Sequence, residues 1–583
     1  MPIRMKKSLS NSLSKYGPWL LVLVLGVVVF LFWRFRYPFA LAYHEQFQLF
    51  LFDGDYFCER MAEPGGLARY IAEFLVQFYN NVTIGALVLA LLFMLLVVTM
   101  GKVVFVDRPE RKERFQDTFL LCMIPLILLW YTMGDESVML TYAVAFELAL
   151  LAIILWRRLA PQNKVFRWVV MLVMIPLLYW LIGPLVLMVA LFLTPWPLAV
   201  AALVYGVALI LASAWVLPYP LQRLLLGVGY YRYPESLPYA LMGLPLLVLL
   251  FHWLYRRGYL YRLNWLKSGP LLAFVLILGG LLVPFGFDDR KYELIEYDYL
   301  VRANDWQGII AKAEQKRPDL PMSVSATNLA LAMTNQLGDR AFDFYQRGSQ
   351  GLLPKFERNF ATTQLTGEIY FHLGLVNTAQ RFAFEAMEAI PNYNKSARAV
   401  KRLAETNLIN GQYDVARKYL QMLEKTIFYR RWAQRTMDML GDEKTIDAHP
   451  LYATMRQYRL QEDFLFSDRE LDKICGQLFL HNQQNRMAAQ YLVMLPLLEA
   501  DMARFMQYMQ VVQSKISYNP RHCQEGIAFA FMQRRQQPPQ GVVSPMILQQ
   551  MNEFTRAYSS GGKTAPGLQQ FRNTVWYYLV CSE

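Results

Sequence analysis

The sequence predicts an all-α protein in two parts, a polytopic helical membrane domain over residues 1–287 and then a soluble α-helical repeat solenoid. Three observations support this prediction. Apolar residues make up 55% of the 583, which is too large a share for an ordinary soluble chain. Long apolar runs, separated by short basic connectors, fill the chain up to Phe287. Beyond Phe287 charged amphipathic patterns with a helical period replace these runs, and the alternation typical of strands is scarce.

The membrane spans follow from the lengths of the apolar runs. A helix needs about 17–25 mostly apolar residues to cross ~30 Å of hydrocarbon. The runs that reach or approach this length are Gly17–Trp33, Val82–Met100, Thr118–Met133, Val138–Trp156, Leu198–Leu217, Leu241–Leu254 and Pro270–Phe287. A further stretch, Trp168–Leu193, is either one long helix or two pieces broken at Gly183-Pro184.

Basic residues give these spans a direction. Residues 1–287 carry 23 Lys and Arg against 14 Asp and Glu, and the excess lies in the N-terminus and the connectors, as expected of cytoplasmic segments. Two pieces in Trp168–Leu193 put every basic connector on the side of the N-terminus, which gives about nine spans. We therefore expect a multi-pass protein of the cell (inner) membrane with a cytoplasmic N-terminus and an extracytoplasmic C-terminal domain. Its charge is explained by a lipid bilayer, and no nucleic acid is needed as a partner.

Turn-like residues recur at a regular period in residues 288–440. Asn304, Gly338, Gly374 and Gly411 follow one another at intervals of 34, 36 and 37 residues, which is the period of a helix-pair repeat. Within this region one segment resembles a tetratricopeptide repeat in the order of Gly367, Tyr370, Gly374, Ala379, Ala386 and Pro391. The resemblance covers roughly residues 292–430 and implies a curved solenoid that binds a protein or peptide partner, or that serves as a spacer. Residues 441–583 are expected to be a further helical region.

The common enzymatic motifs are missing from the sequence. It contains no paired CxxC, no HExxH and no GxxxxGK[ST]. A structural disulfide fits the scattered cysteines better than a metal site does, because four of the five fall on the predicted outer side; they are Cys58, Cys122, Cys475, Cys523 and Cys581. The sequence thus predicts no metal ligands, and the cofactor stays unknown.

The first outer loop, residues 37–81, is too long for a connector and too apolar to lie in water. Arg69, Glu73 and Gln77 recur every four residues in Gly66–Tyr79 with apolar residues between them, which predicts a helix lying on the membrane surface. A second such helix is expected over Phe39–Phe52. Between the two lie the acids of Asp53-Gly54-Asp55 and the turn Pro64-Gly65-Gly66.

Carboxylates return on the same side of the membrane at Asp135 and Glu136, in a short turn between spans, and Glu147 lies inside the next span. An ionised acid at that depth costs at least ~2.5–3.5 kcal/mol, which makes Glu147 a functional candidate. Glu136 and Glu147 are about three helical turns apart, so both would point into one outward cavity. The alternative is that Glu147 is protonated or bonded to a neighbouring helix, and that Asp53 and Asp55 only decorate a turn.

This layout of a long acidic outer loop, many spans and a C-terminal extracytoplasmic domain resembles the GT-C superfamily of membrane glycosyltransferases, which use lipid-linked sugar donors. The resemblance implies that Asp53 or Asp55 is the catalytic base or helps to bind a metal, and that Asp135 and Glu136 form a second acidic catalytic site. It also implies that Arg69, Arg223 or Arg232 meets the donor phosphate as a guanidinium fork. Glu147 is a further candidate substrate-binding residue because of its position inside a span.

Three functions fit these observations. The first is a GT-C-like glycosyltransferase of cell-envelope glycan assembly, with a polyprenyl-linked sugar as its donor. The second is a non-enzymatic membrane-anchored scaffold that binds proteins through its helical repeats. The third is a transporter, which draws on Glu147 and on the broken span at Gly183-Pro184.

Overall fold

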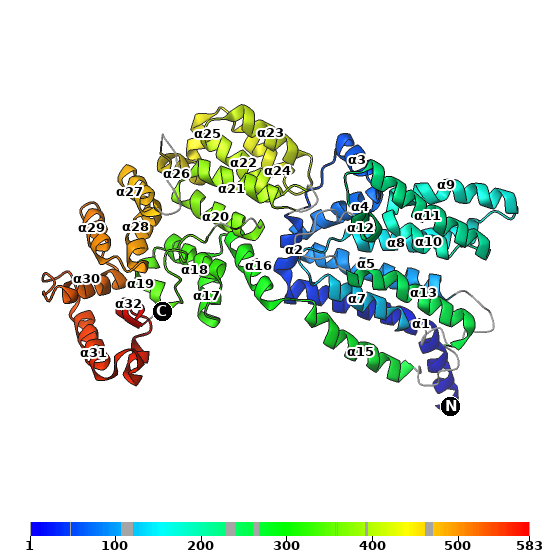
Figure 1. The fold of residues 1–583 in the computed structure, drawn as a ribbon, viewed down its shortest axis with the longest axis horizontal. Coiled ribbons are helices and arrows are strands. Elements are labelled where there is room, and N and C mark those ends of the chain that lie inside the picture. The colour runs from blue at the N-terminus through cyan, green and yellow to red at the C-terminus, as the bar shows by residue number, and fades with distance from the viewer. Residues whose placement is uncertain are drawn as a thin grey trace. The chain divides into compact units, whose positions relative to one another are not determined.

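The computed structural model describes residues 2–46, 48–105, 120–227, 239–259, 268–355, 357, 360–390, 394–460 and 470–581. Throughout these ranges the chain forms helices joined by turns and loops, with no strand (Figure 1). The structure therefore confirms the all-α prediction, with apolar helices first and a long helical region after them. The predicted basic connectors around Arg108–Arg114 and Arg262–Lys267 lie outside the described residues.

The chain divides into two compact units that do not follow the chain order strictly. The first unit contains Met1–Tyr292 together with two short connectors from further along the chain, Ile390–Ala397 and Lys425–Arg430. The second unit contains Glu293–Ala389, Arg398–Glu424 and Arg431–Glu583. These two segments are called the first and the second connector below. Both belong to the first unit although the helices on either side of them belong to the second.

The long helices of the first unit follow the predicted apolar runs. They are α1 (Pro2–Leu31), extended by η1 (Phe32–Arg36), and then α5 (Val82–Val104), α7 (Met123–Thr132), α8 (Thr141–Leu159), α9 (Lys164–Ile182), α11 (Trp196–Val216), α13 (Gly243–Arg257) and α15 (Ser268–Phe285). Shorter helices lie between them, namely η4 (Gly183–Leu185), α10 (Val186–Leu191), α12 (Leu221–Leu226) and η5 (Tyr239–Met242). Helix α16 (Asp289–Arg302) follows α15 after a bend of 67°.

Five helical stretches of the described residues are long and apolar enough to cross a membrane, or six if the bent pair of α15 and α16 is one span. Their outer surfaces are apolar, since large side chains stay exposed along them, such as Leu87, Leu91 and Leu95 on α5, Val204 and Leu211 on α11, and Leu276, Ile277 and Leu281 on α15. Water-soluble proteins rarely expose apolar surface on this scale, and lipid covers it without cost. The length and the surface of these helices indicate association with a membrane.

The stretch Trp168–Leu193 contains one helix of spanning length. Gly183, with φ of 66°, interrupts the helix at the predicted break, but the second piece, α10, has only six residues. Six residues rise about 9 Å, far less than the ~30 Å of a hydrocarbon core. The nine-span arrangement counted two crossings here. The extracytoplasmic position of residues 288–583 depended on that count and remains a prediction.

Helix follows helix through the second unit. The elements are α17 (Trp306–Gln315), α18 (Pro321–Met333), α19 (Leu337–Arg340), η7 (Ala341–Asp343), α20 (Phe360–Leu373), α21 (Val376–Glu388), α22 (Ala397–Ile409), α23 (Tyr413–Glu424), α24 (Arg430–Asp438), α25 (Glu443–Ala448), α26 (Pro450–Tyr458), α27 (Leu471–His481), α28 (Arg486–Leu498), α29 (Met502–Gln513), α30 (Arg521–Gln533), α31 (Pro545–Gly561), η10 (Gly562–Thr564), η11 (Pro566–Phe571) and α32 (Val575–Cys581). Neighbours pack as antiparallel hairpins, as α20 with α21 and α27 with α28 (Figure 1).

One type of turn recurs between these helices. A residue with a left-handed backbone ends the first helix, and the next N–H donates to the carbonyl five residues back at 2.7–3.0 Å, as in a Schellman motif. The left-handed residues are Asn304, Asn335, Gly374, Gly411, Ala500 and Arg535. Three of the four predicted turn positions, Asn304, Gly374 and Gly411, are therefore confirmed. Gly338 instead lies inside α19, because Asn335 makes that turn three residues earlier.

Two of these glycines allow a matched test of the turn. Gly374 has φ of 95°, and a Cβ added there would lie 2.7 Å from the Cβ of Tyr458, whereas Gly411 has φ of 76° and open space around it. We expect Gly411→Ala to cost about 1–2 kcal/mol for the left-handed backbone alone. Gly374→Ala should cost a further ~1–3 kcal/mol for the overlap with Tyr458. Thermal unfolding of the full chain in detergent measures both, and equal losses would contradict the close approach of Tyr458.

Candidate functional site

Residues 37–81 of the first unit, predicted as the first outer loop and called the outer loop below, form three helices and one segment without helix. Helix α2 (Pro38–Glu45) is followed by an extended backbone over residues 48–53, and then by α3 (Gly54–Met61) and α4 (Gly66–Val76), which continues as η2 (Gln77–Asn80). The predicted surface helix over Phe39–Phe52 is therefore wrong in its length. Most of α2 is buried on all sides, because it packs against α5 and η2.

Helix α4 is present where it was predicted, but its polar face points inward. Arg69, Glu73 and Gln77 are exposed by only 6%, 1% and 7%, and α4 packs against α3, α8 and α9. Its apolar residues are half-buried, among them Leu67, Ile71, Phe74 and Leu75. The amphipathic pattern correctly predicted a polar and an apolar face. The prediction that the polar face meets water was wrong, because charged residues of the protein itself enclose that face.

Glu73 is at the centre of this enclosed polar stripe. The Nε of Arg60 donates to one of its oxygens at 2.7 Å, and the Nε of Arg69 donates to the other at 3.0 Å. The hydroxyl of Tyr56 donates to the same carboxylate, and the Arg60 guanidinium lies 4.4 Å from the centre of the Tyr56 ring. Burial, and then the charge of Glu73, raise the pKa of Tyr56 well above its usual 10, so Tyr56 remains a hydrogen-bond donor.

Arg69 extends this network in two directions. Its Nη1 donates to Glu63 at 3.1 Å, and its Nη2 donates to the Oδ1 of Asn394, in the first connector, at 2.8 Å. Glu63 also accepts from the hydroxyl of Tyr219, which lies just before α12. The turn Pro64-Gly65-Gly66 forms as predicted, with Gly65 at φ of 82° and its N–H donating to the carbonyl of Trp180 at 2.9 Å.

Asp53, the first of the four candidate catalytic acids, is held by the second connector. Lys425 donates to its carboxylate at 2.6 Å, and this hydrogen bond holds the pKa of Asp53 below its usual range. The N–H of Phe52 donates to the carbonyl of Lys425 at 2.7 Å. The extended segment also receives the first connector, since the N–H of Leu49 donates to the carbonyl of Lys395 at 3.1 Å.

Further contacts secure the second connector to the loop. The hydroxyl of Tyr429 donates to Glu45 at 2.8 Å and accepts from the Nδ2 of Asn80 at 3.1 Å. Phe428 packs edge to face on Phe78, with 5.9 Å between ring centres. The outer loop thus binds both connectors by side chains as well as by backbone.

The other candidate acids each have a setting of their own. Asp55, in the first turn of α3, is exposed. Asp135 accepts from the N–H and the hydroxyl of Ser137 at 2.9 and 2.6 Å. Glu136 is paired with Lys291 at 2.7 Å. Glu147, buried in α8, accepts from the hydroxyl of Thr99 on α5 at 2.7 Å.

The predicted substrate-binding arginines also lie in different surroundings. Arg69 is committed to the Glu73 network, Arg223 is half-buried in α12, and Arg232 lies outside the described residues. The contacts of the described acids and arginines thus run to structural partners, and none of these contacts joins Asp53 or Asp55 to Asp135 or Glu136. Their catalytic and binding roles remain predictions. All five cysteines are free thiols.

The second unit contains a buried ion cluster that sequence reasoning missed. Glu368 on α20 accepts from Arg402 at 2.7 Å and lies 3.4 Å from Arg398, and Arg398 also donates to both oxygens of Asp298 at 2.9 and 3.0 Å. Burial alone would raise the pKa of Glu368, but the two arginines outweigh it and lower the value to about 2. Burial lowers the pKa of the adjacent His372 to about 4, which keeps its ring neutral.

Two carboxylates that pair with the same arginine allow a test of the loop network. Glu73 is buried between Arg60 and Arg69, whereas Glu59 meets Arg60 at 3.0 Å from a side chain that is 66% exposed. Glu73→Ala leaves two buried guanidinium groups without their central anion and should lower the free energy of unfolding by about 3–5 kcal/mol. Glu59→Ala removes a surface pair and should cost at most ~1 kcal/mol. Denaturant unfolding in detergent compares them, and similar losses would argue against a structural role of Glu73.

Acid should weaken the ion cluster of the second unit through His372. Its folded pKa of about 4 lies below its ordinary value of 6.5, so the unfolded chain binds more protons between these values and stability falls as the pH falls through this window. We expect the midpoint of thermal unfolding to fall less steeply from pH 6.5 to 4 in His372→Gln than in the wild type. Parallel curves would mean that the pKa of His372 is the same in the folded and the unfolded chain, and would contradict this prediction.

Comparison with known proteins gives one result. The chain matches no curated protein and no solved structure. One family model, that of DUF6057, a family of unknown function, matches residues 14–582. Because this match runs through nearly the whole chain, across both units, the protein belongs to the DUF6057 family.

Proposed function

We propose that this protein is a membrane-anchored scaffold in which the apolar helices fix the chain in a bilayer and the outer loop fastens two connectors of the C-terminal helical region. The helical repeats would then bind a protein or peptide partner on the extracytoplasmic side. The observation that carries this proposal is the pairing of the loop carboxylates with cations of the chain itself, above all Asp53 with Lys425 at 2.6 Å.

A catalytic carboxylate must be free to meet its substrate. In the outer loop, Glu73 and Glu63 are occupied by arginine and tyrosine donors. Glu136 outside the loop is likewise paired with a lysine. These groups act as fasteners, because Glu73 joins the neighbouring helices α3 and α4, and Glu63 and Glu136 bind Tyr219 and Lys291 from distant parts of the sequence. The same acids would have to break these contacts before they served as bases.

The second unit supports a binding role in a different way. Its helical hairpins recur with the same left-handed turn at Asn304, Asn335, Gly374 and Gly411, and stacked hairpins offer an extended surface of the kind that repeat proteins use for partners. The resemblance of Gly367–Pro391 to a tetratricopeptide repeat favours a peptide or protein as that partner.

Exchanging the charges of Asp53 and Lys425 distinguishes a structural role of Asp53 from a catalytic one. Asp53→Lys should impair the protein, because it places two lysines together, and the double variant Asp53→Lys with Lys425→Asp should restore it by remaking the pair in reverse. A catalytic Asp53 would remain inactive in both variants. The measurement is the envelope integrity of cells in which each variant replaces the natural copy, with membrane insertion checked in parallel. Failure of the double variant to recover, despite normal insertion, would contradict the scaffold.

One observation favours the glycosyltransferase as a second candidate function. Asp55 is exposed in the first turn of α3, and no described side chain pairs with it, so it remains available to a lipid-linked sugar. Under this alternative Asp55→Asn abolishes function while leaving the thermal stability unchanged. Under the scaffold proposal Asp55→Asn leaves the envelope intact, and the same cells report both outcomes.

A further inference from the structure

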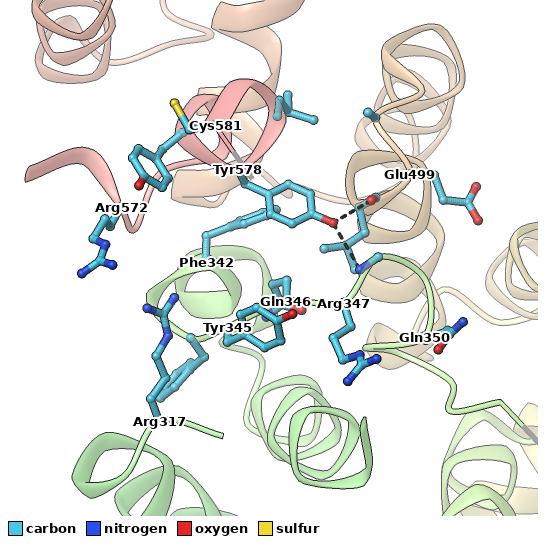
Figure 2. A pocket seen from close by; sticks show the side chains of 16 residues that line it. Arg317, Phe342, Tyr345, Gln346, Arg347, Gln350, Glu499, Arg572, Tyr578 and Cys581 are labelled. Carbon is cyan, nitrogen blue, oxygen red and sulfur yellow. Dashed lines mark hydrogen bonds between the residues drawn. The ribbon is translucent and has the colours of Figure 1, made fainter. Parts of the chain in front are cut away.

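A cleft of about 610 Å³ opens within the second unit, and none of the candidate acids or arginines discussed so far lines it. Its walls come from the loop after α17, from residues 342–350, from the end of α28, from Arg572 just after η11, and from α32 (Figure 2). A volume of this size falls within the range of small-ligand sites, about 300–1,000 Å³.

Three arginines line this cleft, namely Arg317, Arg347 and Arg572. All three are exposed, and the guanidinium group of none of them forms an ion pair or hydrogen bond with another residue in the described ranges. The acids nearby are already taken, since Glu499 pairs with Arg504 at 3.0 Å and Asp343 lies 3.4 Å from Arg521. The cleft therefore carries a positive charge that the described part of the protein does not neutralise.

The cleft is held in shape by Tyr578. As Figure 2 shows, its hydroxyl donates to the carbonyl of Leu498, at 2.9 Å, and accepts from the N–H of Gly348, at 3.2 Å. This one side chain thus joins α32, the end of α28 and the loop at 344–350. Two side-chain hydrogen bonds between Gln346 and Asn328 fix the same loop.

The lining combines charge with aromatic surface. Arg317 and Arg572 extend from opposite walls toward the same end of the cleft, and Tyr345 lies between this end and Arg347 (Figure 2). Tyr345 is 42% exposed, so its ring offers a face to a ligand. Guanidinium groups bind carboxylates and phosphates through paired N–H donors, and aromatic faces bind rings and apolar chains.

We propose that this cleft binds an organic anion, with a carboxylate or phosphate group held by Arg317 and Arg572 and an apolar or aromatic portion lying on Tyr345. This site is independent of the scaffold proposal, because it uses none of the loop acids or connectors. It gives the second unit a ligand of its own, one that the Schellman turns and the buried ion cluster do not require.

The test uses the full chain in detergent micelles and two small organic probes, phenyl phosphate and benzoate, with inorganic phosphate as a reference that lacks a ring. Their binding is followed by ligand-observed NMR against empty micelles. We expect saturable binding of at least one probe, and weakening with added salt. Losing a charged hydrogen-bond partner typically costs ~1.5–3 kcal/mol, so Arg317→Gln and Arg572→Gln should each weaken binding about tenfold or more. Tyr345→Ala should weaken phenyl phosphate more than inorganic phosphate.

Arg556 provides the matched control, because it is an exposed arginine on α31 that does not line the cleft. Arg556→Gln should leave binding unchanged, and all variants should keep the wild-type midpoint of thermal unfolding. Binding of phenyl phosphate alone identifies a phosphate ligand, and binding of both probes supports the shared anion chemistry. The proposal is overturned if neither probe saturates, or if Arg556→Gln weakens binding as much as Arg317→Gln does.

Discussion

The buried carboxylate of Glu73, held between Arg60 and Arg69, is the interaction on which the first unit is organised. Two guanidinium groups and a tyrosine hydroxyl satisfy it, and charges this deeply enclosed are tolerated only when they are fully paired. Because the three ion partners come from α3 and α4, the network fixes how these two helices pack. Arg69 also donates hydrogen bonds to Glu63 and to Asn394, which comes from a distant part of the chain.

The same network changes how the acidic loop is understood. A stretch rich in carboxylates beside apolar helices invites a catalytic interpretation, yet Asp53, Glu63 and Glu73 each pair with a cation of the chain. Asp55 is the exception, since no described side chain pairs with it. Unmatched charge of the opposite sign gathers in the arginines of the cleft in the second unit. Ligand binding is therefore expected where the protein leaves its charge uncompensated.

Much of the architecture is predictable from the sequence, because local patterns specify local structure. The apolar runs indicated the long helices, and the residue types at Asn304, Gly374 and Gly411 indicated their turns. The turns at Ala500 and Arg535 gave no such signal, since neither residue favours a left-handed backbone by itself. The period of α4 predicted which residues form its polar and its apolar face. It did not predict what packs on each face, because an amphipathic pattern carries no such information. Lys425, the partner of Asp53, lies 372 residues away in the sequence, so a local pattern cannot predict that the two residues pair.

The two connectors in the first unit also impose an order on biosynthesis. Asn394 and Lys425 complete contacts that begin at Arg69 and Asp53, so the outer loop cannot finish folding until the ribosome has passed residue 430. Until then the polar stripe of α4 lacks one of its partners, although the apolar helices around it have already been synthesised. Contacts of such long sequence separation form slowly, and the nascent chain is exposed to misfolding during this interval. A chaperone that shields the loop would act at this stage of synthesis.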